Sequence, residues 1–280
     1  MSKSEPLKND YLKGGLIEPR EYQLEIASEC VAKNSLVVIP TGLGKTIIAI
    51  LLVAETLKIA PSGSKVIIMA PTKPLINQHH ESFLKFLDVE ETDCSILTGK
   101  VSPDDRPVQF KDSKFILFTP QTLRNDLVNE KYDLSEVGLI IFDEAHHASG
   151  DYPYPLIADL YTEQNPDGTI LALTASPGAS KDKIAKLCHL LHVPVENIHI
   201  RTRKDRDVKR YLKPLDVYKV GVKFNSLMED IHLALHQVLE GKLRFLLNAH
   251  FLEEDKEPLY KHVYRKDLLD VNRRLQAIIS

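Results

Sequence analysis

The hydrophobic pattern between residues 35 and 173 alternates between short apolar runs and longer segments with apolar residues at helical spacing. Short runs rich in Val, Ile and Leu predict buried strands, and the amphipathic segments between them predict helices that cover a sheet. This alternation is typical of an α/β fold in which a parallel sheet lies between two layers of helices. The predicted strands are Leu36–Ile39, Lys65–Ala70, Ser95–Leu97, Phe115–Phe118, Leu139–Phe142 and Thr169–Leu173.

The segments between the strands predict helices because their apolar residues recur every three to four positions. Each predicted strand is followed directly by Pro, Thr or Asp, where a chain reversal is expected. Ligands of open α/β sheets bind at the carboxyl ends of the strands, so we expect the functional site there. The predicted helices are Glu21–Ala32, Lys45–Leu57, Lys73–Phe86, Gln121–Asn129, Pro155–Tyr161 and Lys181–Leu191.

The pattern changes after Val193-Pro194. A basic run and an extended stretch near Val217–Lys223 precede two long helical patterns, at about Ser226–Phe251 and Tyr260–Ile279. Two helices alone cannot fully bury their apolar stripes, so this region predicts the start of a helical domain that the chain does not complete. We therefore divide the chain into a tail (1–15), an α/β domain (16–200), a basic linker with a strand (201–223) and a partial helical domain (224–280).

Composition places the chain among soluble globular proteins, with 43% hydrophobic and 27% charged residues. It excludes disordered, collagen-like and disulfide-scaffold classes. The three cysteines lie far apart without metal-ligand spacing, which favours structural thiols in a reducing compartment. The polar N-terminus and the lack of a long apolar run predict an intracellular protein that does not interact with membranes.

Charge is distributed unevenly, because residues 201–280 carry 17 Lys and Arg against 12 Asp and Glu although the whole chain has a net charge of −3. The densest basic run lies between Arg201 and Arg210. Such a run indicates either a solvated linker or a surface that faces a polyanion, and the sequence leaves both interpretations open.

A phosphate-binding loop follows the first predicted strand. Its glycines let backbone N–H groups curl round phosphate oxygens, and the following helix adds positive potential. Lys45 would reach the β and γ phosphates, and Thr46 would offer a hydroxyl to Mg²⁺. Ile39 stands where the strict pattern has glycine, so the strand–loop–helix context supports the prediction more than the bare pattern does. The predicted loop residues are Pro40, Thr41, Gly42, Leu43, Gly44, Lys45 and Thr46.

Two acids follow the predicted strand at Leu139–Phe142. Asp143 would hold Mg²⁺, and Glu144 would orient or deprotonate an attacking water. The alternative is a charge pair that favours the start of a helix. His146 could relay nucleotide state to a neighbouring segment or be a structural histidine. We interpret His79, His80, His189 and His192 as structural, because no ligand constellation surrounds them.

The order of the phosphate loop, Asp143-Glu144-Ala145-His146 and Leu173-Thr174-Ala175-Ser176-Pro177 resembles superfamily 2 helicases of the DEAH type. Within that group, residues 16–200 look like the first RecA-like lobe of the family of archaeal Hef and FANCM, and the later helices are similar in placement to its helical insertion. The resemblance implies a RecA-like three-layer parallel sheet. The closer motifs are Glu18-Pro19-Arg20-Glu21-Tyr22-Gln23, Ala70-Pro71-Thr72-Lys73-Pro74-Leu75, Thr98-Gly99, Thr119-Pro120-Gln121-Thr122 and Ile141-Phe142-Asp143-Glu144-Ala145-His146.

The resemblance also implies roles for single residues and ligands. Arg20 and Gln23 would contact adenine, and Thr174 and Ser176, with His146, would couple nucleotide state to the nucleic-acid path. ATP and Mg²⁺ would be the cofactors, and forked or branched DNA and a second RecA-like lobe the partners. The residues implied along the DNA backbone are Pro71, Thr72, Lys73, Thr98, Gly99, Thr119, Pro120 and Gln121.

Two departures from the family pattern limit this expectation. His147 stands where the family generally has Arg or Lys, and no second lobe with its arginine finger follows in the sequence. We expect an N-terminal fragment of a DNA helicase or translocase, archaeal and nucleoid-associated, that binds nucleotide and turns over little alone. The alternatives are an RNA-directed superfamily 2 helicase of the Dicer or RIG-I kind and a non-catalytic nucleotide-dependent binding module.

Overall fold

The computed structural model describes residues 9–176, 181–212, 220–252 and 258–279. The chain divides into two compact units, Met1–Lys213 and Pro214–Ser280. None of the helices in these described ranges is long and apolar enough to cross a membrane.

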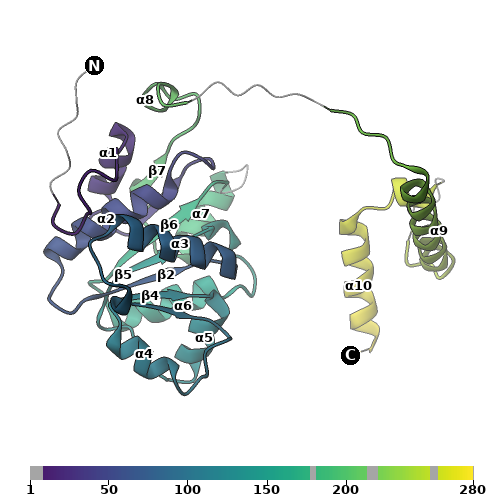
Figure 1. Cartoon of the computed structure of the whole chain (residues 1–280). Helices are drawn as coiled ribbons and strands as arrows, with labels where there is room; N and C mark the ends of the chain where they lie inside the picture. The colour runs from purple at the N-terminus through teal and green to yellow at the C-terminus, as the bar shows by residue number, and fades with distance from the viewer. Residues whose placement is uncertain (1–8, 177–180, 213–219, 253–257, 280) are drawn as a thin grey trace. The chain divides into compact units, whose positions relative to one another are not determined.

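The first unit is built on a seven-stranded sheet with the order β3-β4-β2-β5-β6-β1-β7, in which every pairing is parallel (Figure 1). This confirms the predicted α/β fold, and each of the six strands predicted between residues 36 and 173 is found with ends that differ by at most two residues. The strands are β1 (Ser35–Val38), β2 (Lys65–Met69), β3 (Cys94–Leu97), β4 (Phe115–Phe118), β5 (Val137–Phe142), β6 (Thr169–Thr174) and β7 (Ile198–Ile200).

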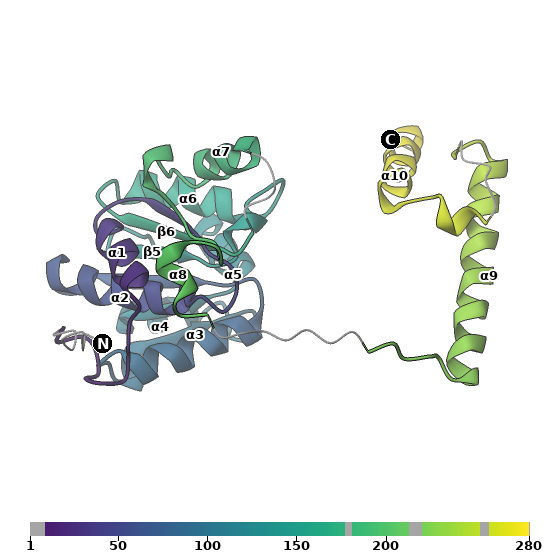
Figure 2. The same ribbon diagram turned by 90° about the horizontal axis from the view of Figure 1, so that it is seen from above.

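Successive strand residues enter opposite cores, as the two-residue period of a strand requires. Val37 and Ile141 pack with α1, α2 and α3 on one face, and Val38 and Phe142 pack with α5, α6 and α7 on the other (Figures 1 and 2). The sheet is therefore the middle of three layers. The helices of this unit are α1 (Glu21–Glu29), α2 (Lys45–Ile59), α3 (Lys73–Phe86), α4 (Arg106–Asp112), α5 (Pro120–Val128), α6 (Pro153–Gln164), α7 (Lys181–Leu190) and α8 (Arg206–Lys209).

Some predicted boundaries are wrong for local reasons. The first helix ends at Glu29, and it cannot continue to the predicted Ala32, whose backbone is left-handed with φ of 54°. The strand predicted near 217–223 is not found in residues 220–223, and residues 217–219 lie outside the described part of the chain. The strand that the sequence analysis missed is β7, which pairs with β1.

Residues 201–212 are not the linker that the charge run suggested. Val208, in α8, is fully buried in the core beneath α1 and α2. The Arg201 guanidinium lies 3.0 Å from the carboxylate of Glu25 on α1. The predicted tail also contacts this unit. The Asn9 amide donates to the Glu55 carboxylate on α2 at 3.0 Å.

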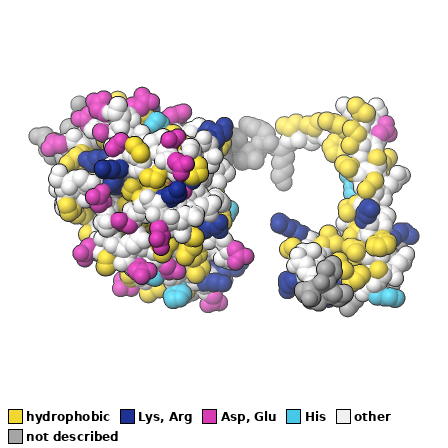
Figure 3. Space-filling view, turned by 90° about the horizontal axis from the view of Figure 1, so that it is seen from below, with side chains coloured by type: hydrophobic (Ala, Val, Ile, Leu, Met, Phe, Trp, Pro, Cys, Tyr) yellow, Lys and Arg dark blue, Asp and Glu magenta, His cyan; other side chains and the backbone are white. Residues whose placement is uncertain are grey.

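The second unit consists of α9 (Ser226–Asn248), the turn η4 (Leu259–Lys261) and α10 (Arg265–Ile279). Its small core contains Leu243, Leu252, Leu259 and Val271. Most apolar side chains of α9 are exposed, and hydrophobic side chains cover much of this unit's visible face (Figure 3). The two predicted helices are therefore present, with an apolar stripe that no other described residue covers.

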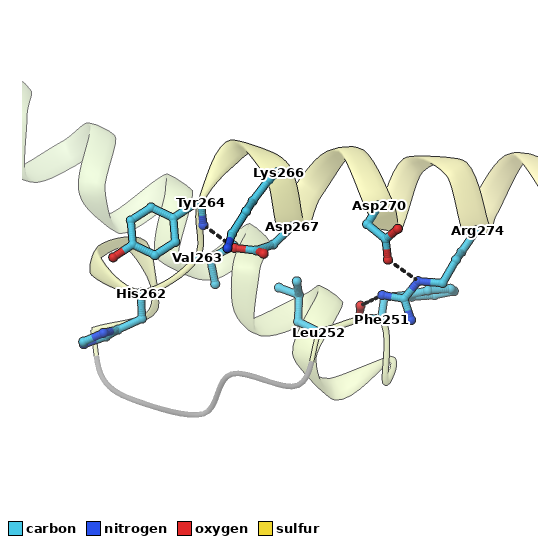
Figure 4. A pocket seen from close by; sticks show the side chains of 9 residues that line it. All are labelled: Phe251, Leu252, His262, Val263, Tyr264, Lys266, Asp267, Asp270 and Arg274. Atoms are coloured by element: carbon cyan, nitrogen blue, oxygen red, sulfur yellow. Dashed lines mark hydrogen bonds and ion pairs between the residues drawn. The ribbon is translucent and has the colours of Figure 1, made fainter. Parts of the chain in front are cut away.

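A groove of about 640 Å³ lies in this unit between the start of α10 and the chain at Phe251 (Figure 4). Two of its charged side chains, Asp270 and Arg274, pair with each other. Arg274 donates to the Phe251 carbonyl at 2.6 Å and lies 3.4 Å from the Asp270 carboxylate. The groove contains no residue of the predicted nucleotide site.

Candidate functional site

The phosphate loop links β1 to α2, and both of its glycines have backbone conformations that favour glycine. Gly42 and Gly44 have φ of 83° and 87°. A Cβ at Gly44 would also collide with the side-chain amide of Gln23. Ile39 is fully buried, and its N–H donates to the Thr174 carbonyl at 3.0 Å, so it extends the core where the strict pattern has glycine.

Gln23 supports this loop from below. The side chain is 3% exposed, and its amide donates to the Leu43 carbonyl at 3.0 Å while its oxygen accepts the Arg20 N–H at 3.0 Å. The Tyr22 hydroxyl donates to the same Leu43 carbonyl at 2.6 Å. The Arg20 guanidinium lies over the ring of Tyr211, 5.6 Å from its centroid. The adenine contacts implied for Arg20 and Gln23 stay predictions.

Asp143 lies at the carboxyl end of β5 and is 6% exposed. Ile141 faces α2 and α3, so the strand alternation directs Asp143 to the same side. There Oδ2 lies 2.7 Å from Nε2 of His79 on α3, and Oδ1 accepts the Glu144 N–H at 2.9 Å. Burial alone would raise the pKa of Asp143, but the His79 hydrogen bond, the Glu144 N–H and the Lys45 charge together lower it. His79, which we interpreted as structural, thus contacts a residue of the predicted nucleotide site.

Glu144 turns toward the phosphate loop from a strained backbone. Its φ of 49° is uncommon for a residue other than glycine. One carboxylate oxygen lies 3.1 Å from Nζ of Lys45, and the other lies 3.3 Å from Nδ1 of His146. The structure thus brings together two of the residues predicted for catalysis, which are 99 positions apart in sequence.

The residues that would hold Mg²⁺ have suitable chemistry. Thr46 lies in the first turn of α2, directly after Lys45. Its hydroxyl and the Asp143 carboxylate are oxygen ligands of the kind Mg²⁺ prefers. The lowered pKa of Asp143 keeps that carboxylate ionised at neutral pH, as a metal ligand must be.

The three residues predicted to couple nucleotide state form one connected group. His146 Nδ1 lies 3.1 Å from the Thr174 hydroxyl, which also accepts the Ser176 N–H at 3.2 Å. Burial lowers the pKa of His146, and the neighbouring His147 lowers it further. His147, at the departure from the family pattern, stacks on the ring of Tyr152 with centroids 5.3 Å apart.

The predicted nucleic-acid residues follow β2, β3 and β4 on the same carboxyl edge. Lys73 begins α3 and is exposed, and so is Gln121 in the first turn of α5. Thr98 and Pro120 are buried, so their side chains shape the loops, and Lys100 presents an exposed charge beside Gly99 instead. The ammonium of Lys100 lowers the pKa of Lys73, because two like charges lie close together.

A buried ion pair that the sequence analysis missed fixes the Lys100 loop. Arg106 contacts Asp126 through two hydrogen bonds of 2.8 and 2.6 Å, and its third donor reaches the Val101 carbonyl at 2.8 Å. Tyr132 donates to the same Asp126 carboxylate at 2.8 Å. The pair is separated by 20 residues, so no local pattern marked it.

The basic run after β7 adds one further cation to the nucleotide site. Arg203 donates to the Thr41 carbonyl of the phosphate loop at 3.3 Å. Arg201 and Arg210 pair with Glu25 and Glu21 of α1, whereas Arg203 has no ion-pair partner among the described residues. The run is therefore divided between a packing role and a position beside the loop.

Comparison with known proteins gives consistent results. A family profile described as DEAD/DEAH box helicase matches residues 20–184. The solved helicase domain of Hef from Pyrococcus furiosus is similar over 96% of this chain and 55% of that chain, with a TM-score of 0.71 and 35% identity.

Two curated relatives differ in the nucleic acid that their names give. A Methanocaldococcus jannaschii protein, MJ1505, provisionally named an ATP-dependent RNA helicase, is 32% identical over 96% of this chain and 33% of its own length. The ATP-dependent DNA helicase fml1 of Schizosaccharomyces pombe is 32% identical over 83% of this chain and 28% of its own length. The chain spans about a third or less of either relative.

Proposed function

Because this chain belongs to the DEAD/DEAH box helicase family, we propose that it is the nucleotide-binding lobe of an ATP-dependent DNA helicase or translocase that acts on forked or branched DNA. The similarity to Hef and to fml1 supports the Hef and FANCM type. Acting on such DNA would place the protein in the cell interior with the nucleoid.

The arrangement of Lys45, Glu144 and Asp143 at one sheet edge carries this proposal. The Lys45 ammonium now contacts Glu144 at 3.1 Å. When β and γ phosphates enter the loop, the ammonium exchanges that carboxylate for phosphate oxygens. Glu144 is then released to accept a hydrogen bond from the attacking water and to take its proton.

Asp143 and Thr46 would hold Mg²⁺, which neutralises the charge that develops on the phosphates. The loop N–H groups orient the nucleotide, and His146 with Thr174 joins Glu144 to the end of β6. Fast turnover also needs an arginine from a second lobe, a contribution of about 10³–10⁵ in rate in related phosphoryl-transfer enzymes. The described residues contain one RecA-like sheet, and therefore one lobe. This lobe alone should hydrolyse ATP slowly, because the second lobe's arginine is not among these residues.

The test is ATP hydrolysis by the full-length protein, alone and with forked DNA, linear duplex DNA or duplex RNA. We expect stimulation by forked DNA and about a 10²–10⁴-fold loss in Glu144→Gln, because the general base is removed. Asp151→Asn, at an exposed acid near the same edge, is the control. Wild-type turnover in Glu144→Gln would overturn the mechanism.

An RNA-directed helicase is the second candidate, because the MJ1505 relative is named for RNA. The exposed charges of Lys73 and Lys100 suit phosphates, which DNA and RNA share. Stimulation by duplex RNA and not by forked DNA would replace the first proposal with this one. Nucleotide binding without turnover under every condition would favour the non-catalytic module.

A further inference from the structure

His79 contacts Asp143 from α3, the helix that begins at Lys73 of the predicted nucleic-acid path. It is 5% exposed, and its Nε2 lies 2.7 Å from Oδ2 of Asp143. An ionised carboxylate only accepts hydrogen bonds, so Nε2 carries the hydrogen and donates. The other ring nitrogen, Nδ1, is buried and has no partner among the residues that the structure describes.

We infer that His79 is a positioning residue that connects the Mg²⁺-nucleotide site to the nucleic-acid path through α3. This inference rests on the proposed function. The contact places the middle of α3 against the carboxylate that would hold the metal, while the first-turn end of the helix presents Lys73. Nucleic acid bound at that end and Mg²⁺·nucleotide bound at Asp143 then favour the same position of α3.

Groups outside α3 also hold Asp143, which makes the part played by α3 separable. The Glu144 N–H fixes Oδ1 at 2.9 Å, and the Tyr154 hydroxyl of α6 donates to the Asp143 carbonyl at 2.7 Å. His79 alone holds Oδ2 in the described structure. Removing it leaves the backbone of Asp143 in place and frees the carboxylate oxygen that faces α3.

The helix is a rigid connection between the two sites. His79 lies six residues after Lys73, which corresponds to about 9 Å along a helix. Ile76 and Phe83, on either side of His79, are fully buried in the core against the sheet. A displacement of the helix at its first turn is therefore transmitted to His79 rather than absorbed between them.

The unpartnered Nδ1 also argues against a role in packing alone. Position 79 lies in the apolar stripe between Ile76 and Phe83, where an aliphatic side chain would fill the same space without a buried polar atom. Leaving such an atom unpaired opposes folding. The hydrogen bond to Asp143 is the one interaction that explains a histidine here.

The test measures coupling, which a merely structural residue would not change. The full-length protein is titrated with forked DNA, with and without Mg²⁺ and a non-hydrolysable ATP analogue. The ratio of the two DNA dissociation constants is the coupling factor, and linkage requires DNA to change analogue affinity by the same factor. For the wild type we expect a coupling factor between about 5 and 150, the usual range for coupled sites.

We expect His79→Leu to bring the coupling factor to about one, with analogue affinity in the absence of both Mg²⁺ and DNA unchanged. His79→Gln, which retains a side-chain N–H donor, should retain most of the coupling. His80→Leu, one position along the same helix, is the matched control. If His79→Leu does not fold, His79→Met gives the same readout with an unbranched side chain.

The possible failures are distinguishable. A wild type that binds neither analogue nor DNA refutes the proposed function and this inference with it. A wild type that binds both without coupling, or a His79→Leu protein that keeps the wild-type coupling factor, refutes the inference and leaves the helicase proposal standing. Loss of coupling in His80→Leu as well would also refute it, because the effect would then belong to α3 as a whole.

Discussion

The two halves of the carboxyl sheet edge are built differently. At the ends of β1, β5 and β6, the charged side chains Asp143, Lys45 and Glu144 each have a defined partner within hydrogen-bond distance. At the ends of β2, β3 and β4, Lys73 and Lys100 are exposed and repel each other. The first half is pre-organised for the proposed chemistry at one phosphate group, whereas the second presents the exposed charge that the proposed nucleic-acid partner would meet.

The strand order explains how the halves meet. β2 and β5 are neighbours in the sheet, so the half with the predicted nucleic-acid residues (the nucleic-acid half) ends where the half with the predicted nucleotide site (the nucleotide half) begins. Asp143 extends β5, and α3 follows β2. The contact between His79 and Asp143 therefore joins the two halves. Four changes, two in or beneath each half, test the contrast between them.

The largest effect is expected in the nucleotide half, at Lys45. Lys45→Ala removes the cation that would meet the phosphates and leaves Glu144 without its 3.1 Å partner. ATP turnover by the full-length protein should fall by about 10²–10³-fold, the usual effect of losing one stabilising group from a pre-organised site. Lys33→Ala, at an exposed lysine outside the site, should hydrolyse ATP like the wild type. If Lys45→Ala lost DNA affinity but kept wild-type ATP turnover, the contrast between the two halves of the sheet edge would be wrong.

A large loss of stability is expected beneath the nucleic-acid half. Asp126→Ala leaves the Arg106 charge buried and unpaired, so the free energy of unfolding should fall by about 3–5 kcal/mol. Asp104→Ala removes a surface contact to Lys131 and should cost about 0–1 kcal/mol. Urea unfolding of the two variants measures both values, and equal losses would show that the Arg106 pair does not anchor the Lys100 loop.

A moderate effect is expected on the exposed surface. Lys73→Ala combined with Lys100→Ala should weaken binding of every nucleic-acid sequence alike, because these groups meet phosphates and not bases. The slope of log affinity against log salt should become shallower by roughly one per lysine. Fluorescence anisotropy across a salt series measures the slope, and affinity for the ATP analogue alone serves as the internal control.

The smallest effect is expected at Arg203, beside the phosphate loop. Arg203→Ala removes an exposed hydrogen bond to the Thr41 carbonyl and a nearby positive charge. Nucleotide affinity should fall by at most about fivefold, because one exposed charge beside the phosphates contributes about 0–1 kcal/mol. Lys204→Ala, at the next basic residue, should leave it unchanged; equal losses would assign the effect to the total charge of the run.

Much of the fold could be predicted because its strands are buried on both faces and read as continuous apolar runs. The placement of the predicted phosphate loop after β1 and of Asp143-Glu144 after β5 could be predicted because each motif is local in sequence. β7 was missed because it has three residues, one of them His199. The seven-residue α4 is too short for its apolar spacing to show.

The missed contacts are tertiary. His79 and Asp143 are separated by 64 residues, and sequence alone does not state that α3 covers the end of β5. A signal was nevertheless present, since His79 falls in the same stripe as Ile76 and Phe83 and therefore faces the core. In the basic run, the charges concealed Val208, whose burial decides that the segment packs.

The strand order also has a consequence for how the protein emerges from the ribosome. β1, which leads into the phosphate loop, is synthesised first, yet its sheet neighbours β6 and β7 are synthesised last. At about 5–20 residues per second, β1 waits on the order of 10 s for its partners. During that interval an apolar strand and a glycine-rich loop are exposed to the cell, so the nascent chain needs protection until its sixth strand appears.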